Sequence, residues 1–153
     1  MRLHAKMPEL TGEGIWLNGR VETNGLIGEH PTFIHFWSVS CELCKQAMPN
    51  VNRLRDEYIG RLNVVAVHMP RFDEDLDEDR IIEAAKEHTV TEPIFIDHKL
   101  ELTEAFDNKY VPAYYLFDRS GVLRHFQAGG GSLKMMEKRV VRLIETPKPE
   151  GEA

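Results

Sequence analysis

Residues 32–44 read TFIHFWSVSCELC, and this stretch contains the change from strand to helix that decides the fold. Its first six residues follow Pro31 and are mostly β-branched or aromatic, which is typical of a buried strand. Beyond that run, apolar side chains recur at helical spacing, at Ala47, Val51, Leu54 and Tyr58. We therefore predict an amphipathic helix over about residues 42–59, with Cys41 at the junction between strand and helix.

Cys41 and Cys44 are the only cysteines among the 153 residues. A disulfide between them would close so small a loop that it would remove little entropy from the unfolded chain, so chemistry explains the pair better than stapling does. A thiol at a helix N-terminus meets unpaired backbone N–H groups and the positive end of the helix dipole, and both favour the thiolate. We expect Cys41 to be the attacking nucleophile and Cys44 the resolving thiol.

Two other uses of the cysteine pair are less favoured. Zinc usually takes four ligands, and this chain offers only the two cysteines and scattered histidines, so we predict no metal site. Covalent haem attachment requires histidine directly after the second cysteine, where this chain has Lys45. The expected redox group is the cysteine pair itself, without a cofactor.

The rest of the chain alternates short apolar runs with amphipathic stretches, which is typical of an α/β fold with one sheet. The predicted strands are residues 15–17, 62–68, 93–96, 113–117 and 122–127. The predicted further helices are residues 78–88, residues 100–106 and a last helix beginning near Ser132. The final two strands flank a turn at residues 118–121 and should form a β-hairpin.

Pro49 falls inside the helix predicted after Cys41. A proline in a helix interior removes one backbone hydrogen bond. The favoured interpretation is a kinked helix that continues through Pro49, because the apolar spacing continues beyond it; a shorter helix is the alternative.

Length and composition indicate one domain, which we place at residues 1–146, followed by a flexible tail at residues 147–153. With 42% hydrophobic and 29% charged residues the chain can bury a sizeable core. Its formal charge of −6 disfavours nucleic acids and anionic membrane surfaces as partners. We expect a monomer.

The first residues contain no apolar core of a signal peptide, and no stretch is long enough to span a bilayer. We therefore expect a cytoplasmic protein. In that reducing compartment a close cysteine pair is more often catalytic, redox-sensing or metal-binding than structural.

Several residues together resemble the thioredoxin superfamily, and within it the TlpA/ResA-like thiol-disulfide oxidoreductases. They are Phe36-Trp37, the segment from Cys41 to Lys45, Pro49 and Val111-Pro112. The resemblance implies a thioredoxin-like fold, with a central mixed β-sheet flanked by helices. It also implies an N-terminal β-hairpin and a helix-strand insertion at about residues 68–97.

The same resemblance implies a substrate groove formed by Trp37, Val111 and Pro112. Pro112 should be cis and lie beside the dithiol, and its flanking backbone should pair with an extended substrate peptide. A trans proline that begins a strand is the alternative from the sequence alone. The implied partners are protein thiols and disulfides together with a cytosolic electron donor.

Three residues near the dithiol make this site differ from that of its better-known relatives. His35 stands where thioredoxins have a buried aspartate; it is a candidate proton shuttle, or else a core histidine with a satisfied partner. Ala47 stands where ResA-like proteins often carry a glutamate. Glu42 lies in the first helical turn and opposes a thiolate at Cys41.

The acidic stretch at residues 73–79 is interpreted as solvated residues that cap the following helix, since an EF-hand loop would need glycine where Glu78 stands. Two rival functions remain open. One is a thiol-dependent peroxidase, although Ile34 stands where the peroxiredoxin motif has proline. The other is a redox-gated binding module, for which this acidic stretch is the motivation.

Overall fold

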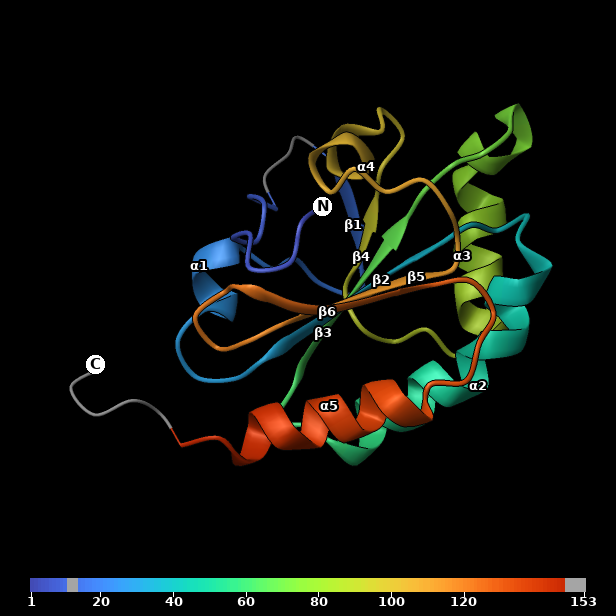
Figure 1. The fold of residues 1–153 in the computed structure, drawn as a ribbon. Coiled ribbons are helices and arrows are strands. Elements are labelled where there is room, and N and C mark those ends of the chain that lie inside the picture. Colours follow the sequence, from blue (N-terminus) through green and yellow to red (C-terminus); the bar gives the residue numbers. More distant parts are fainter. Residues whose placement is uncertain (11–13, 148–153) are drawn as a thin grey trace.

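The strand predicted before the cysteine pair lies in the middle of the sheet. The computed structural model describes residues 1–10 and 14–147, and within them six strands form one sheet in the order β1-β4-β3-β2-β5-β6 (Figure 1). The strands are β1 (Ile15–Leu17), β2 (Thr32–Trp37), β3 (Asn63–His68), β4 (Ile94–Ile96), β5 (Ala113–Phe117) and β6 (Leu123–Ala128). All six residues of β2 are buried, as a strand covered on both faces should be.

The sheet is mixed. Strand β2 pairs in parallel with β3 and antiparallel with β5, and β3 pairs in parallel with β4. The hairpin predicted at residues 113–127 is formed by β5 and β6. Because parallel neighbours place their carboxyl ends at the same edge, Trp37 at the end of β2 lies opposite His68 at the end of β3.

Helices cover both faces of this sheet (Figure 1). They are α1 (Thr23–Leu26), α2 (Glu42–Glu57), the 3₁₀ turn η1 (Asp73–Leu76), α3 (Glu78–Glu87), α4 (Glu101–Ala105) and α5 (Lys134–Glu145). One face packs against α2, α3 and α5, and the other packs against α1, α4 and the segment near Met7. The predicted mixed sheet flanked by helices is confirmed.

The predicted elements agree with the observed ones to within about two residues at each end. Helix α2 continues through Pro49, so the alternative of a shorter helix is wrong. Its buried stripe contains Met48, whereas Ala47 is only half-buried. Ser132 accepts a hydrogen bond from the N–H of Lys134 at 3.2 Å, although the N-cap residue of α5 is Leu133.

The N-terminal β-hairpin implied by the family resemblance is wrong for the described residues. Strand β1 instead pairs antiparallel with β4, and Trp16 packs edge-on against Phe95 with ring centroids 5.2 Å apart. Earlier in the chain, Lys6 forms an isolated bridge with Val122. The N-terminal segment therefore contacts two separate parts of the fold. Strand β1 pairs with β4 because the free edge of β4 offers backbone groups with which a three-residue strand can form hydrogen bonds.

The expected helix-strand insertion at residues 68–97 contains η1, α3 and β4. Residues 148–153 of the predicted tail lie outside the described residues, and the domain boundary at residue 146 stays a prediction. Within the described ranges, no helix is long and apolar enough to cross a membrane.

Aromatic rings fill the core on the face that α4 covers. Phe106 is fully buried and packs edge-on against Phe36 and Tyr115, with centroids 5.1 Å and 5.0 Å away, and against Phe117 at 6.1 Å. These contacts tie the end of α4 to two central strands of the sheet, β2 and β5.

We predict that Phe106→Ala lowers the free energy of unfolding by about 3–5 kcal/mol, because it removes a buried ring and leaves a cavity. Urea unfolding followed by circular dichroism measures this. Phe72→Ala is the matched control, since Phe72 is 58% exposed and its loss should change stability by no more than about 0.5 kcal/mol. Equal effects of the two variants would contradict the prediction.

Candidate active site

Cys41 and Cys44 form a disulfide at the N-terminus of α2, with their Cα atoms 5.2 Å apart. Cys41 is the N-cap residue in extended conformation, and its Sγ accepts a hydrogen bond from the backbone N–H of Cys44 at 3.1 Å. This bond satisfies one of the free N–H groups of the helix end. After reduction, the same donor is positioned to stabilise a negative charge on the Cys41 sulfur.

Both cysteines are buried, with only 3% of Cys41 and 1% of Cys44 exposed. Their side chains belong to a core cluster with Trp37, Met48 and residues of α3. Only a small part of the surface of Cys41 is therefore open to solvent.

The segment between β2 and Cys41 is tied to the end of β3. The N–H of Val39 donates to Nε2 of His68 at 3.0 Å, and the N–H of Met69 donates to the carbonyl oxygen of Trp37 at 2.8 Å. The hydroxyl of Ser38 donates to the carbonyl oxygen of Met69. These hydrogen bonds fix the turn that carries the first cysteine.

His68 is held neutral by its surroundings. Burial lowers the pKa of His68 to about 4, and the nearby Asp75 carboxylate opposes that effect only in part. A neutral imidazole can accept the Val39 N–H at Nε2, which an imidazolium cannot. Sequence reasoning missed this role, because pairing of β2 with β3 brings His68 to the turn.

The peptide bond between Val111 and Pro112 is cis, as the family resemblance implied. Val111 is half-buried and packs against the cluster that contains the two cysteines. Next to the dithiol, a Cβ on Gly130 would lie 3.4 Å from the exposed side chain of Leu43. The loop that contains Gly130 therefore lies against Leu43 in the first turn of α2.

Trp37 differs from the expectation of a groove residue. Only 1% of it is exposed, and its ring packs edge-on against His68 with centroids 5.0 Å apart. In this structure Trp37 packs against the histidine that accepts the Val39 N–H, and its contact with a substrate stays a prediction.

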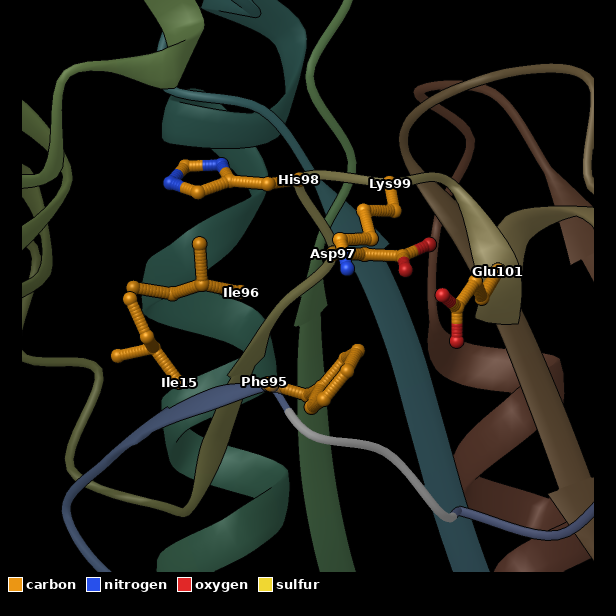
Figure 2. Close-up of a pocket in the computed structure, with 8 residues that line it drawn as sticks. Ile15, Phe95, Ile96, Asp97, His98, Lys99 and Glu101 are labelled. Atoms are coloured by element: carbon orange, nitrogen blue, oxygen red, sulfur yellow. The ribbon is translucent and has the colours of Figure 1, made fainter.

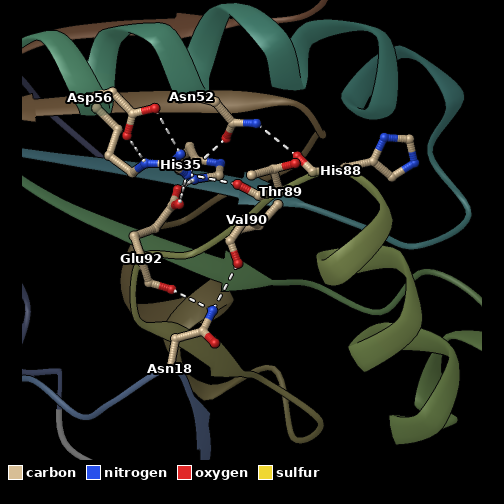
Figure 3. A network of polar contacts seen from close by, with 9 residues as sticks. Asn18, His35, Asn52, Asp56, His88, Thr89, Val90 and Glu92 are labelled. Carbon is tan, nitrogen blue, oxygen red and sulfur yellow. Dashed lines mark hydrogen bonds and ion pairs between the residues drawn. The ribbon is translucent and has the colours of Figure 1, made fainter.

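His35 takes part in a buried polar network (Figure 3). Its Nε2 lies 2.6 Å from Oε2 of Glu92, and Oε1 of Glu92 accepts from Nη1 of Arg55 at 2.8 Å. Arg55 also donates to Oδ1 of Asn52 at 3.0 Å and to the carbonyl oxygen of Thr89 at 2.9 Å. No hydrogen bond joins His35 to either cysteine among the described residues.

Glu92 is only 5% exposed and nonetheless ionised. Burial alone would raise its pKa, but hydrogen bonds from His35 and Arg55 and the charge of His35 outweigh burial and lower the pKa to about 2. The network joins α2, β2 and the residues before β4. An arginine on the apolar stripe of α2 was the sequence signal for it, since a buried guanidinium requires an anionic partner.

One residue of the acidic stretch contradicts its interpretation as solvated. Asp77 does cap α3, accepting a hydrogen bond from the N–H of Asp79 at 3.0 Å. Asp75, in contrast, is fully buried, and its carboxylate accepts a hydrogen bond from the hydroxyl of Ser40 at 2.8 Å. The insertion therefore reaches the residue that precedes Cys41.

A separate hollow of about 460 Å³ lies between β1, β4 and the start of α4 (Figure 2). Ile15, Phe95 and Ile96 form its apolar part, with polar side chains at the rim. Asp97 at this rim is engaged, since its carboxylate accepts hydrogen bonds from Leu102 and Thr103 of α4. In the described ranges, no group of three or more histidine, cysteine or acidic side chains could hold a metal ion.

A dithiol at a helix N-terminus, a cis-proline directly before β5 and a mixed sheet of this order together define a thioredoxin-like protein. The chain belongs to the AhpC/TSA family, whose model matches residues 4–126. It is 62% identical to the thiol-disulfide oxidoreductase YkuV of Bacillus subtilis (strain 168) over 144 residues, which cover 94% of this chain and 97% of that protein.

Two further comparisons agree with this family. The chain is 27% identical to the thiol-disulfide oxidoreductase ResA of Halalkalibacterium halodurans over 145 residues, covering 94% of this chain and 73% of ResA. A solution structure of a thioredoxin-like protein in the oxidized form matches with a TM-score of 0.86 at 62% identity, covering 94% of this chain and 97% of that one. The thioredoxin-like fold is confirmed, and the protein is a thiol-disulfide oxidoreductase.

We predict that the buried carboxylate of Glu92 makes the stability of the protein depend on acid. Its pKa is about 2 in the folded protein and near 4.5 when unfolded, so its stabilising effect is present above pH 4.5 and is lost as pH falls toward 2. The loss should amount to about 3 kcal/mol. Urea unfolding at several pH values measures it.

Glu92→Gln is the control for this acid dependence. It lacks the titrating carboxyl group, so the difference in unfolding free energy between the original protein and the variant should shrink as pH falls from 5 to 2. Subtraction cancels the contribution of His68, which also titrates in acid. A difference that stays constant with pH would contradict the assignment.

Proposed function

We propose that this protein exchanges electrons with protein disulfides and dithiols through Cys41 and Cys44. The observation that carries the proposal is the hydrogen bond from the Cys44 N–H to the Cys41 sulfur at the start of α2. This donor and the helix dipole favour a thiolate at Cys41, which makes it the nucleophile. Cys44 lies one turn further and deeper, as a resolving thiol should.

In the reducing direction, the Cys41 thiolate attacks one sulfur of a substrate disulfide. A mixed disulfide forms, the substrate S–S bond breaks, and the other substrate sulfur leaves as a thiolate and takes up a proton. Cys44 then loses its proton and attacks the Cys41 sulfur, which re-forms the Cys41–Cys44 disulfide and releases the second substrate thiolate. Two electrons pass to the substrate, and a cytosolic electron donor would restore the dithiol.

We propose that the substrate segment lies along the backbone beside Val111 and Pro112. The exposed side chains around this segment support a protein substrate, because Leu43 is 53% and Tyr110 is 70% exposed. An extended peptide at this place would bring its disulfide to the end of α2.

We propose His35, which lies on the strand that leads to the dithiol, as the proton shuttle for Cys44 during resolution. Glu92 holds the imidazole of His35 in place through Nε2, and Arg55 in turn holds Glu92. The competing hypothesis is a structural histidine that completes the buried network.

We propose a cytoplasmic monomer whose only redox group is the cysteine pair. Both cysteines of the chain belong to this pair, so no structural disulfide calls for an oxidising compartment. The formal charge of −6 supports protein partners over nucleic acids or anionic membranes. Sedimentation at several protein concentrations tests the monomer.

The peroxidase hypothesis is less well supported. Ile34, at the position of the peroxiredoxin proline, is buried within β2, and the hydroxyl of Ser38 is already engaged by the Met69 carbonyl oxygen. The other rival hypothesis, a redox-gated binding module, predicts that the protein binds a partner in only one oxidation state of the cysteine pair and shows no turnover.

We predict that Cys44→Ser accumulates mixed disulfides through Cys41, because the resolving thiol is gone. Non-reducing electrophoresis and mass spectrometry detect these adducts, and insulin reduction with a thiol donor should fall at least about a hundredfold. Cys41→Ser is the control and should form no adducts. Adducts on both variants or neither, or peroxide consumption faster than disulfide exchange, would overturn the proposed function.

We predict that His35→Asn slows the resolution step, since the shuttle group is lost. Stopped-flow release of a fluorescent peptide thiol from the mixed disulfide measures the step. Arg55→Gln is a matched control that weakens the same network but keeps the imidazole. If the two variants lose equal stability and resolve the mixed disulfide at equal rates, His35 has a purely structural role.

A further inference from the structure

Asp75 connects the insertion to the active-site turn. Its Oδ2 accepts three hydrogen bonds, from the hydroxyl of Ser40 at 2.8 Å, the N–H of Arg71 at 2.8 Å and the N–H of Phe72 at 3.2 Å. Ser40 directly precedes Cys41, the N-cap residue of α2. The carboxyl group of Asp75 is therefore hydrogen-bonded to the residue that directly precedes the attacking cysteine.

The charge of Asp75 is only partly compensated. Three donors converge on one oxygen, as expected for a carboxylate, which accepts hydrogen bonds and donates none. The other oxygen, Oδ1, is buried and has no hydrogen-bond partner in the described part of the chain. Because Asp75 is fully buried, solvent screens its charge weakly, and the charge acts on its neighbours more strongly than an exposed one would.

Other charged and titratable groups surround the same turn. The guanidinium of Arg71 donates to the Ser40 hydroxyl from Nε at 3.3 Å and Nη2 at 3.1 Å, and it lies over the ring of Phe72. Arg71 is exposed, so water screens its charge. Glu42 is exposed as well, whereas His68 is neutral through burial. The buried anion therefore outweighs the exposed cation.

We propose that Asp75 lowers the reduction potential of the Cys41–Cys44 couple and so favours action as a reductant of protein disulfides. Reduction of the couple consumes two electrons, and the product carries a thiolate on Cys41. A neighbouring anion raises the free energy of that thiolate and leaves the uncharged disulfide almost unaffected. The equilibrium shifts toward the disulfide, which means that the dithiol gives up its electrons more readily.

Asp75 is thus a positioning residue that acts on Cys41 through charge. The inference rests on the proposed role of Cys41 as the thiolate nucleophile, and it supplies a direction for the exchange. It also gives the acidic insertion a role at the site, which its sequence position alone does not indicate.

The test is equilibration of the dithiol with a glutathione redox buffer at pH 8. Asp75→Asn removes the charge and keeps an oxygen that can accept the Ser40 hydroxyl. We expect its equilibrium constant to shift toward the dithiol by about tenfold, equivalent to about 30 mV. In the same variant, alkylation of Cys41 should proceed at lower pH, because its thiolate is easier to form.

Two controls separate charge from geometry. Asp73→Asn removes an exposed acid from the same 3₁₀ turn and should shift the equilibrium by less than about twofold. Ser40→Ala breaks the hydrogen bond to Asp75 without a change of charge and should also leave the equilibrium within about twofold. A shift by Ser40→Ala as large as that by Asp75→Asn would overturn the proposal.

Arg71→Gln keeps the proposal testable if Asp75→Asn does not fold, because Arg71 is exposed. Without the guanidinium, Asp75 acts unopposed, and the equilibrium should shift toward the disulfide by about two- to threefold. An unchanged equilibrium, or a shift toward the dithiol, overturns the inference. If the original protein exchanges with glutathione but none of these shifts occurs, only the role of Asp75 fails; absence of any exchange would defeat the proposed function itself.

Discussion

The hydrogen bond from the Cys44 N–H to the Cys41 sulfur is the contact on which the site depends. It exists only if Cys41 occupies the N-cap of α2, and that requires β2 to end a few residues earlier, at Trp37. Strand β2 is held there by β3 on one side and β5 on the other. The centre of the sheet therefore sets the position of the attacking sulfur.

Buried charge is placed at two positions around this centre. Under α2, the charge of Glu92 is compensated by His35 and Arg55. These contacts hold together α2, β2 and the segment before β4. At the active-site turn, Asp75 is compensated only through one oxygen, so part of its charge remains free to act on the thiolate. The same chemical group thus stabilises the fold in one place and tunes reactivity in the other.

Much of the fold was predictable because its signals are local. The spacing of apolar residues indicated α2, and β-branched runs indicated the central strands. The N-terminal hairpin was wrong because a strand as short as β1 pairs with whichever free edge the folded sheet presents, and that edge belongs to β4. No local pattern in residues 15–17 specifies this partner.

For the site, the sequence by itself determined the chemistry. Two cysteines at the start of a helix, with Val111-Pro112 further along, identify a thiol-disulfide site because spacing within one helix is a local property. Only the tertiary structure decided which groups act on those cysteines. Glu92 reaches His35, and Asp75 reaches Ser40, through pairing and packing between elements that are far apart in the chain. Side-chain identity is local, whereas burial and electrostatic environment arise only when the whole chain is folded.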